Sequence, residues 1–169
     1  FYRWLKFKEG FSSKLVQYCI RDYQADRVCN LNILDPFSGA GTTLTTAASL
    51  GHQATGIELL PVGTSILKAR LMAANVDRSL YEFYVKKLSE TFEVYSQQNN
   101  LEYKFPHIRI TQHAFSDETE HFLSAYMAFL DSIKMEDIKY LFWFAGLAVL
   151  EDISFTSKDG QYLRWDNRS

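Results

Sequence analysis

The chain has 169 residues, of which 47% are hydrophobic and 15% aromatic, so it can bury a core and is too apolar for wholesale disorder. Its formal net charge of −2 lacks the basic footprint expected of a stand-alone nucleic-acid-binding protein. The longest apolar run, Tyr140 to Leu150, is too short to span a bilayer. The two cysteines form neither a CxxC nor a zinc pattern, which indicates reduced thiols in a cytoplasmic protein.

The first predicted elements are a helix and a short strand. Residues 13–23 carry Leu15, Val16, Cys19 and Ile20 at a spacing of three to four, which predicts a helix. Residues 31–34 are apolar and lead into Asp35-Pro36, so they predict a strand that ends before the proline.

A second helix, strand and helix follow directly. Residues 42–50 predict a helix that stops at Gly51, and residues 54–57 predict another buried strand. Pro61 suits the first turn of a helix that runs to residue 75. This order is a βαβα unit, so we expect its strands to be parallel with a right-handed crossover.

The pattern becomes mainly helical after Asp77. Predicted helices cover 80–95, 118–130 and 137–152, and the last is apolar nearly all round, as in a buried helix. We also expect a polar loop at 97–104, a short strand at 108–110 and a turn at 157–160 before residues 162–165. The resulting division is a core at 1–76, a mainly helical insertion at 77–152 and a return to the sheet at 153–169.

The segment between the first two strands reads Asp35-Pro-Phe-Ser-Gly-Ala-Gly-Thr-Thr43, and it predicts a ligand site. Gly39 and Gly41 permit positive φ and a close approach of ligand to backbone. The next helix begins there, and its free N–H groups favour a carboxylate or phosphate. Asp35 lies where open α/β sheets bind ligands, and its carboxylate favours an ammonium group over a pyrophosphate.

Glu58 ends the second strand and completes the pattern. Its two oxygens can accept both hydroxyls of a ribose, and Leu59 and Leu60 can flank a purine. A Walker loop requires a lysine after Gly41, and a dinucleotide site requires a third glycine in GxGxxG. Neither is present in this segment.

The string DPFSGAGTT followed by GIE resembles the first two motifs of the S-adenosylmethionine (AdoMet)-dependent DNA methyltransferases that modify adenine N6 or cytosine N4. The preceding segment, residues 6–16, is similar in placement to their segment that covers the methionine end of the cofactor. The resemblance implies an α/β, Rossmann-like AdoMet-dependent methyltransferase fold, here with a partial sheet and a helical insertion. In this reading residues 1–169 are the cofactor-binding part of a methyltransferase domain.

The resemblance assigns roles residue by residue. Asp35 binds the amino group of the cofactor, Thr42 its carboxylate and Glu58 its ribose, while the turn lines its methionine and sugar. The implied cofactor-binding residues are Phe11, Ser12, Asp35, Phe37, Ser38, Gly39, Gly41, Thr42, Glu58 and Leu59. No metal is implied.

The catalytic motif of that family is missing from the sequence. It contains two adjacent prolines, whereas Pro36, Pro61 and Pro106 stand apart. The resemblance therefore implies that the catalytic motif lies after Ser169 or on a second chain, and we expect the chain to be an inactive fragment of an enzyme. The implied partner is DNA, bound largely by parts outside this chain. Two alternatives stay open: a methyltransferase for RNA or another amine, and a non-catalytic AdoMet-binding subunit.

Overall fold

The computed structural model describes residues 5, 10–24, 29–98, 101, 103–109, 111–159 and 162–165. The chain divides into two units, residues 1–71 and 72–169, which are described separately. Within the described part of the chain, no helix is both long enough and apolar enough to cross a membrane.

The first unit is built around two parallel strands. It contains α1 (Ser13–Tyr23), β1 (Asn32–Asp35), α2 (Thr42–Ser49), β2 (Gln53–Gly56) and the first turns of α3 (Pro61–Asn75). β1 and β2 pair in parallel, with Asn32 opposite Gln53 and Asp35 opposite Gly56. The predicted order of strand, helix and parallel strand is confirmed, and both strands lie one residue from their predicted bounds.

Local signals set the ends of these helices. Ser12 precedes α1, and its Oγ accepts the backbone N–H of Lys14 at 3.2 Å, which satisfies one free donor at the helix start. Gly51 follows the end of α2 with φ +82°, the left-handed conformation of a glycine stop. The predicted bounds of α1 and α3 are therefore confirmed, as is the stop at Gly51.

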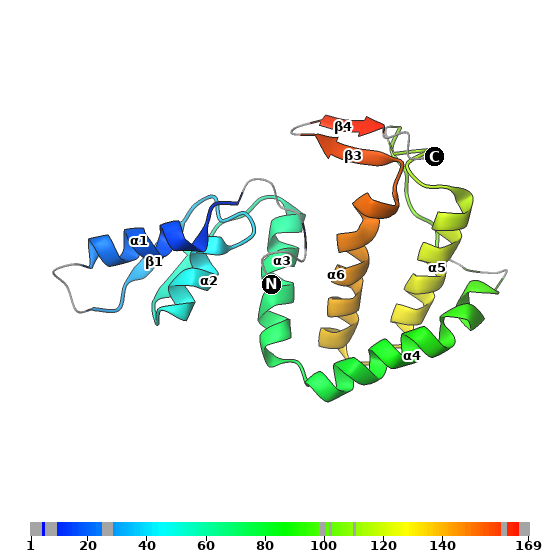
Figure 1. Ribbon diagram of the computed structural model, residues 1–169, viewed down its shortest axis with the longest axis horizontal. Coiled ribbons are helices and arrows are strands. Elements are labelled where there is room, and N and C mark those ends of the chain that lie inside the picture. The colour runs from blue at the N-terminus through cyan, green and yellow to red at the C-terminus, as the bar shows by residue number, and fades with distance from the viewer. Residues whose placement is uncertain are drawn as a thin grey trace. The chain divides into compact units, whose positions relative to one another are not determined.

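Apolar side chains of α1 and α2 bury one face of the two strands. The buried centre consists of Val16, Ile20 and Ala47, and partly buried residues of the strands and their flanks pack against it. Figure 1 shows α1 and α2 beside β1. Leu34, whose side chain alternates with the packed Ile33, is exposed. Packing on one face fixes the strands and so fixes the loops at their ends.

The second unit is mainly helical. It contains α4 (Arg78–Ser96), α5 (Asp117–Asp131), α6 (Glu136–Ile153), β3 (Thr156–Asp159) and β4 (Tyr162–Trp165). α5 and α6 lie side by side, and α4 crosses them (Figure 1). β3 and β4 form an antiparallel pair.

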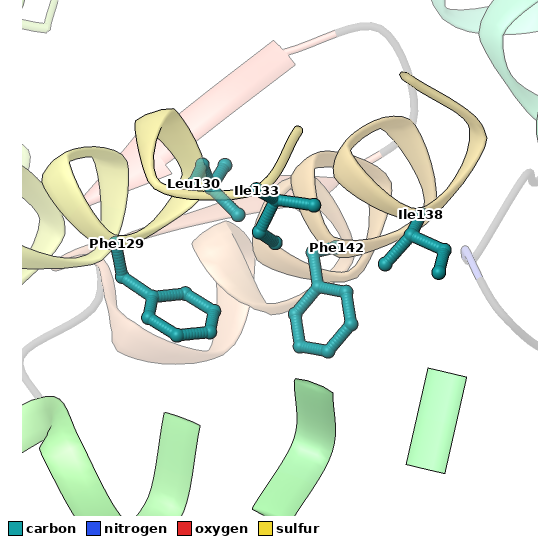
Figure 2. Packing of buried hydrophobic residues seen from close by; sticks show 5 residues of the cluster. All are labelled: Phe129, Leu130, Ile133, Ile138 and Phe142. Carbon is teal, nitrogen blue, oxygen red and sulfur yellow. The ribbon is translucent and has the colours of Figure 1, made fainter. Parts of the chain in front are cut away.

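The core of this unit lies between α5 and α6, above α4 (Figure 2). Its buried residues are Phe129, Leu130, Ile133, Ile138 and Phe142. Aromatic rings of α4 cover this core on its α4 side. The ring centroids of Tyr81 and Phe142 lie 5.1 Å apart, and Tyr95 packs edge-on against Phe129 with 5.8 Å between the centroids. Leu80, Tyr84 and Leu88 of α4 pack against the same core.

Two expectations about strands and turns are wrong. Residues 105–108 form irregular backbone and residue 109 a turn, so the predicted strand is absent at 108 and 109; Ile110 lies outside the described residues. The reason is local: Thr111 donates its N–H to the Ile108 carbonyl and accepts the Ile108 N–H on its Oγ1, so Ile108 has no groups free for a ladder. The predicted turn at 157–160 begins too early, since residues 156–159 are β3; Gly160 lies outside the described residues.

The expectation of a helix buried all round is also wrong. α6 buries Ile138, Leu141, Phe142 and Phe144, but Val149 and Ile153 are exposed. The apolar composition predicted burial on every side, but Val149 and Ile153 border an apolar hollow that α6 shares with Phe122 and Leu123 of α5, and nothing among the described residues fills it.

Tyr126 provides a test of this packing. Its hydroxyl donates to the Phe142 carbonyl at 2.7 Å, joining α5 to α6, and burial raises the pKa of the Tyr126 hydroxyl above its usual range. We expect Tyr126→Phe to lower the free energy of unfolding by about 0.5–1.5 kcal/mol, because the hydrogen bond that joins the two helices is lost while the Phe142 carbonyl keeps its partner within α6. Urea denaturation followed by circular dichroism at pH 7.5 measures this change.

The stability contribution of Tyr126 should also depend on pH. The folded-state pKa lies above the unfolded value near 10, so the Tyr126 contribution is complete below pH 10 and is lost as pH rises through the folded pKa. The stability difference between wild type and Tyr126→Phe should therefore narrow above pH 10. Tyr18→Phe, at an exposed tyrosine of the first unit, is the control and should leave the free energy of unfolding at pH 7.5 close to the wild-type value. A difference that stays constant to pH 11 contradicts the prediction.

Candidate functional site

Two loops leave the same edge of the β1–β2 sheet. Asp35 and Gly56 are register partners at the carboxyl ends of the strands, and the Ile57 N–H donates to the Asp35 carbonyl at 2.9 Å. The segments 36–41 and 57–60 therefore begin side by side. In open sheets with parallel strands, ligands bind at this edge.

The first loop is a turn built on two left-handed glycines. Gly39 has φ +50° and Gly41 has φ +76°, a region that other residues rarely occupy. Inside the turn, the Gly41 N–H donates to the Ser38 carbonyl at 2.7 Å. Ser38 itself donates both its N–H and its Oγ to the Ile57 carbonyl, at 3.0 and 3.2 Å. The glycine turn, residues 36–41, is thus fastened to the second loop.

Two further glycines let these segments approach closely. A Cβ on Gly56 would lie 2.7 Å from the Ser38 Cβ, and one on Gly63 would lie 2.6 Å from the Gly39 carbonyl oxygen. Gly56 belongs to the GIE motif, but the sequence assigned it no packing role, and Gly63 was not identified from the sequence. Gly63 carried a usable signal, because glycine in the first turn of a helix is unfavourable unless close packing requires it.

The glycine turn delivers the start of α2. Gly41 occupies the N-cap position, so no side chain caps the helix, and its first turn carries no acidic residue. No side chain of the N-cap or the first turn therefore neutralises the free N–H groups and the positive end of the helix dipole. Thr42 is buried at this helix start.

Only one of the two carboxylate oxygens of Asp35 has a hydrogen-bond partner among the described residues. Its Oδ1 accepts the Phe37 N–H at 3.1 Å. Its Oδ2 is shielded from solvent and has no hydrogen-bond partner among the described residues. An unpaired buried carboxylate oxygen is costly, so it indicates a missing donor.

Glu58 is held by the backbone that follows it. Its Oε1 accepts the Leu60 N–H at 2.6 Å. The same side chain packs against the start of α3, where a Cβ on Gly63 would lie 2.8 Å from the Glu58 Cγ. The carboxylate is therefore fixed at the beginning of the helix, beside the glycine turn.

Apolar side chains project near both loops. Phe37 is 86% exposed and Leu59 is 92% exposed, which is unusual for side chains of this size. Phe11 lines an apolar hollow of about 520 Å³ beside α1 and β1, which also includes Thr43 of α2. Ser12 caps α1. Of the preceding segment, residues 6–9 lie outside the described part.

The structure thus brings together most of the predicted site residues at one edge of the sheet. These are Asp35, Phe37, Ser38, Gly39, Gly41, Thr42, Glu58 and Leu59. Phe11 and Ser12 lie before α1, and no described hydrogen bond joins them to the other eight.

The first part of the chain is similar to a known family. Residues 5–67 match the model of the DNA methylase family N6_N4_Mtase. The match covers α1, both parallel strands, the glycine turn and Glu58. The predicted resemblance to the DNA methyltransferases that act on adenine N6 or cytosine N4 is confirmed.

The similarity to particular proteins extends over 99% of the chain. The chain is 42% identical to the type II methyltransferase M.AvaI of Nostoc sp. and to that of Anabaena variabilis, and the alignment covers 34% of each relative. It is 36% identical to the type II methyltransferase M.BsoBI of Geobacillus stearothermophilus, over 32% of that protein. The chain thus spans about one third of the length of the curated relatives it matches. No solved structure matches it.

Proposed function

We propose that this chain is the AdoMet-binding part of a DNA methyltransferase that modifies an exocyclic amine, adenine N6 or cytosine N4. The proposed fold is the Rossmann-like AdoMet-dependent methyltransferase fold, with a partial sheet and a helical insertion. In this proposal residues 1–76 form the cofactor-binding core, 77–152 the mainly helical insertion and 153–169 a return to the sheet. The proposed location is the cytoplasm.

The observation that carries the proposal is the unpaired Oδ2 of Asp35. A buried anionic oxygen at the ligand-binding edge of the sheet requires a donor, preferably a cationic one. The α-ammonium group of AdoMet meets this requirement, while its carboxylate suits the uncapped start of α2 near Thr42. A phosphate ligand fits the helix start but not Asp35.

The second loop suits the nucleoside. Glu58 Oε1 already accepts the Leu60 N–H, which fixes the carboxylate while leaving acceptor capacity for the ribose hydroxyls. The exposed Leu59 can cover the adenine, and Phe37, Ser38, Gly39 and Gly41 line the methionine and sugar. Phe11 and Ser12 are the weaker members of the proposed site.

When bound, AdoMet supplies an electrophilic methyl group that an amine takes up by in-line displacement. The residues of this chain hold and orient the donor, and orientation is a large part of the rate enhancement in such a reaction. The catalytic residues and most of the DNA contacts lie outside the chain in this proposal. A base in duplex DNA must leave the stack to reach the donor.

Glu58→Ala tests the nucleoside half of the site. We expect the variant to lose two hydrogen bonds to a charged acceptor, each worth about 1.5–3 kcal/mol. AdoMet affinity should therefore fall by at least about a hundredfold. Isothermal titration calorimetry of the 169-residue chain with AdoMet and S-adenosylhomocysteine measures the change.

Two controls sharpen this test. Glu58→Gln keeps an acceptor for the Leu60 N–H, so it should retain the fold and lose less affinity than Glu58→Ala. Asp22→Ala removes an exposed carboxylate of the same unit and should leave binding unchanged. If a folded Glu58→Ala variant binds AdoMet as tightly as wild type, Glu58 is not part of the site.

A further inference from the structure

α3 contacts the glycine turn through one face. Gly63, Leu67 and Arg70 stand at positions i, i+4 and i+7, which align on one side of a helix. Gly63 faces the Gly39 carbonyl. Leu67 packs against Gly41 so closely that a Cβ added to Gly41 would lie 2.9 Å from the Leu67 Cδ1. The third member of this face, Arg70, supplies a hydrogen bond.

Arg70 bonds to the middle of the turn. Its Nη1 donates to the carbonyl oxygen of Ala40 at 2.6 Å, across 30 residues of sequence. A hydrogen bond from a charged guanidinium is stronger than one between neutral groups. Ala40 is buried and stands between the two left-handed glycines.

This bond fixes a whole peptide group. The Ala40 carbonyl and the Gly41 N–H belong to the same planar peptide unit. The carbonyl end accepts from Arg70, and the N–H end donates to the Ser38 carbonyl at 2.7 Å. With both ends held, the peptide plane cannot rotate between the two glycines, whose own φ and ψ angles are otherwise permissive.

We propose that Arg70 is a positioning residue for AdoMet, because it locks the Ala40–Gly41 peptide and so aims the first turn of α2 at the ligand. This inference rests on the proposed function. Gly41 is the N-cap of α2, so the orientation of its peptide sets the direction of the free N–H groups that follow. Without Arg70, the glycine turn can sample other conformations and binding must restrict them again.

The test compares AdoMet binding by wild type, Arg70→Gln and Arg70→Lys. We expect Arg70→Gln to weaken AdoMet binding about tenfold or more, and Arg70→Lys to recover part of the loss because it keeps a charged donor. Calorimetry is performed at a temperature at which circular dichroism shows every variant folded. Ile20→Ala, which destabilises the buried cluster beside α1, is the matched control and should lower Tm without changing affinity.

The outcomes separate the two proposals. If wild type does not bind AdoMet, the proposed function and the positioning role both fail. If wild type binds and folded Arg70→Gln binds equally well, only the positioning role fails. If Arg70→Gln does not fold, Arg70→Lys decides: reduced affinity with a Tm near wild type supports the role, and unchanged affinity overturns it.

Discussion

Gly63→Ala should weaken AdoMet binding strongly in a chain that still folds. The new methyl group would lie 2.6 Å from the Gly39 carbonyl oxygen and 2.8 Å from the Glu58 Cγ. Because the first contact is with backbone, the glycine turn or α3 must move, and overpacking of this kind costs about 1–3 kcal/mol. The gain in helix propensity, about 1 kcal/mol, offsets only part of this cost. We expect at least a 30-fold loss of affinity, or about 2 kcal/mol, by calorimetry.

Gly51→Ala is the matched control for this change. It adds the same methyl group at a glycine with φ +82° and with no atom within 4 Å of the new carbon. Backbone strain there should lower stability by about 1–2 kcal/mol while AdoMet affinity stays at the wild-type value. If Gly63→Ala binds as tightly as Gly51→Ala, the close packing of α3 on the turn is irrelevant to the ligand.

Asp35→Asn should move affinity and stability in different directions. The variant keeps an oxygen to accept the Phe37 N–H but loses the charge that faces the proposed ammonium group. We expect AdoMet binding to weaken by about 1.5–3 kcal/mol. The melting temperature of the ligand-free chain should stay constant or rise, because a neutral amide is less costly to bury than an unpaired carboxylate oxygen.

Asp22→Asn makes the same chemical change at an exposed position of α1, and it should leave both quantities unchanged. Differential scanning fluorimetry without ligand and calorimetry with AdoMet measure the two effects. A lower melting temperature with unchanged affinity would mean that Asp35 serves the fold and not the ligand.

Local signals in the sequence account for the parts of the fold that could be predicted. The helix at 13–23 has a serine cap and an apolar stripe, and the helix at 61–75 has a proline in its first turn. Such signals depend only on neighbouring residues. The glycine turn was predictable for the same reason, since its residues are contiguous and followed by Glu58.

The parts that could not be predicted depend on distant partners. The bond from Arg70 to Ala40 spans 30 residues, and nothing around Arg70 in the sequence marks it. Short apolar segments were ambiguous, because Ile108 pairs locally with Thr111 and forms no strand. Burial of α6 depends on which neighbours cover it, which composition does not determine.

The most direct test of the central claim is a crystal structure of the 169-residue chain grown with S-adenosylhomocysteine. The amino group of the ligand should lie within hydrogen-bond distance of Asp35 Oδ2, with its ribose hydroxyls on the Glu58 carboxylate and its methionine chain along the glycine turn. A ligand bound elsewhere, or no ligand at this edge of the sheet at saturating concentration, would contradict the account.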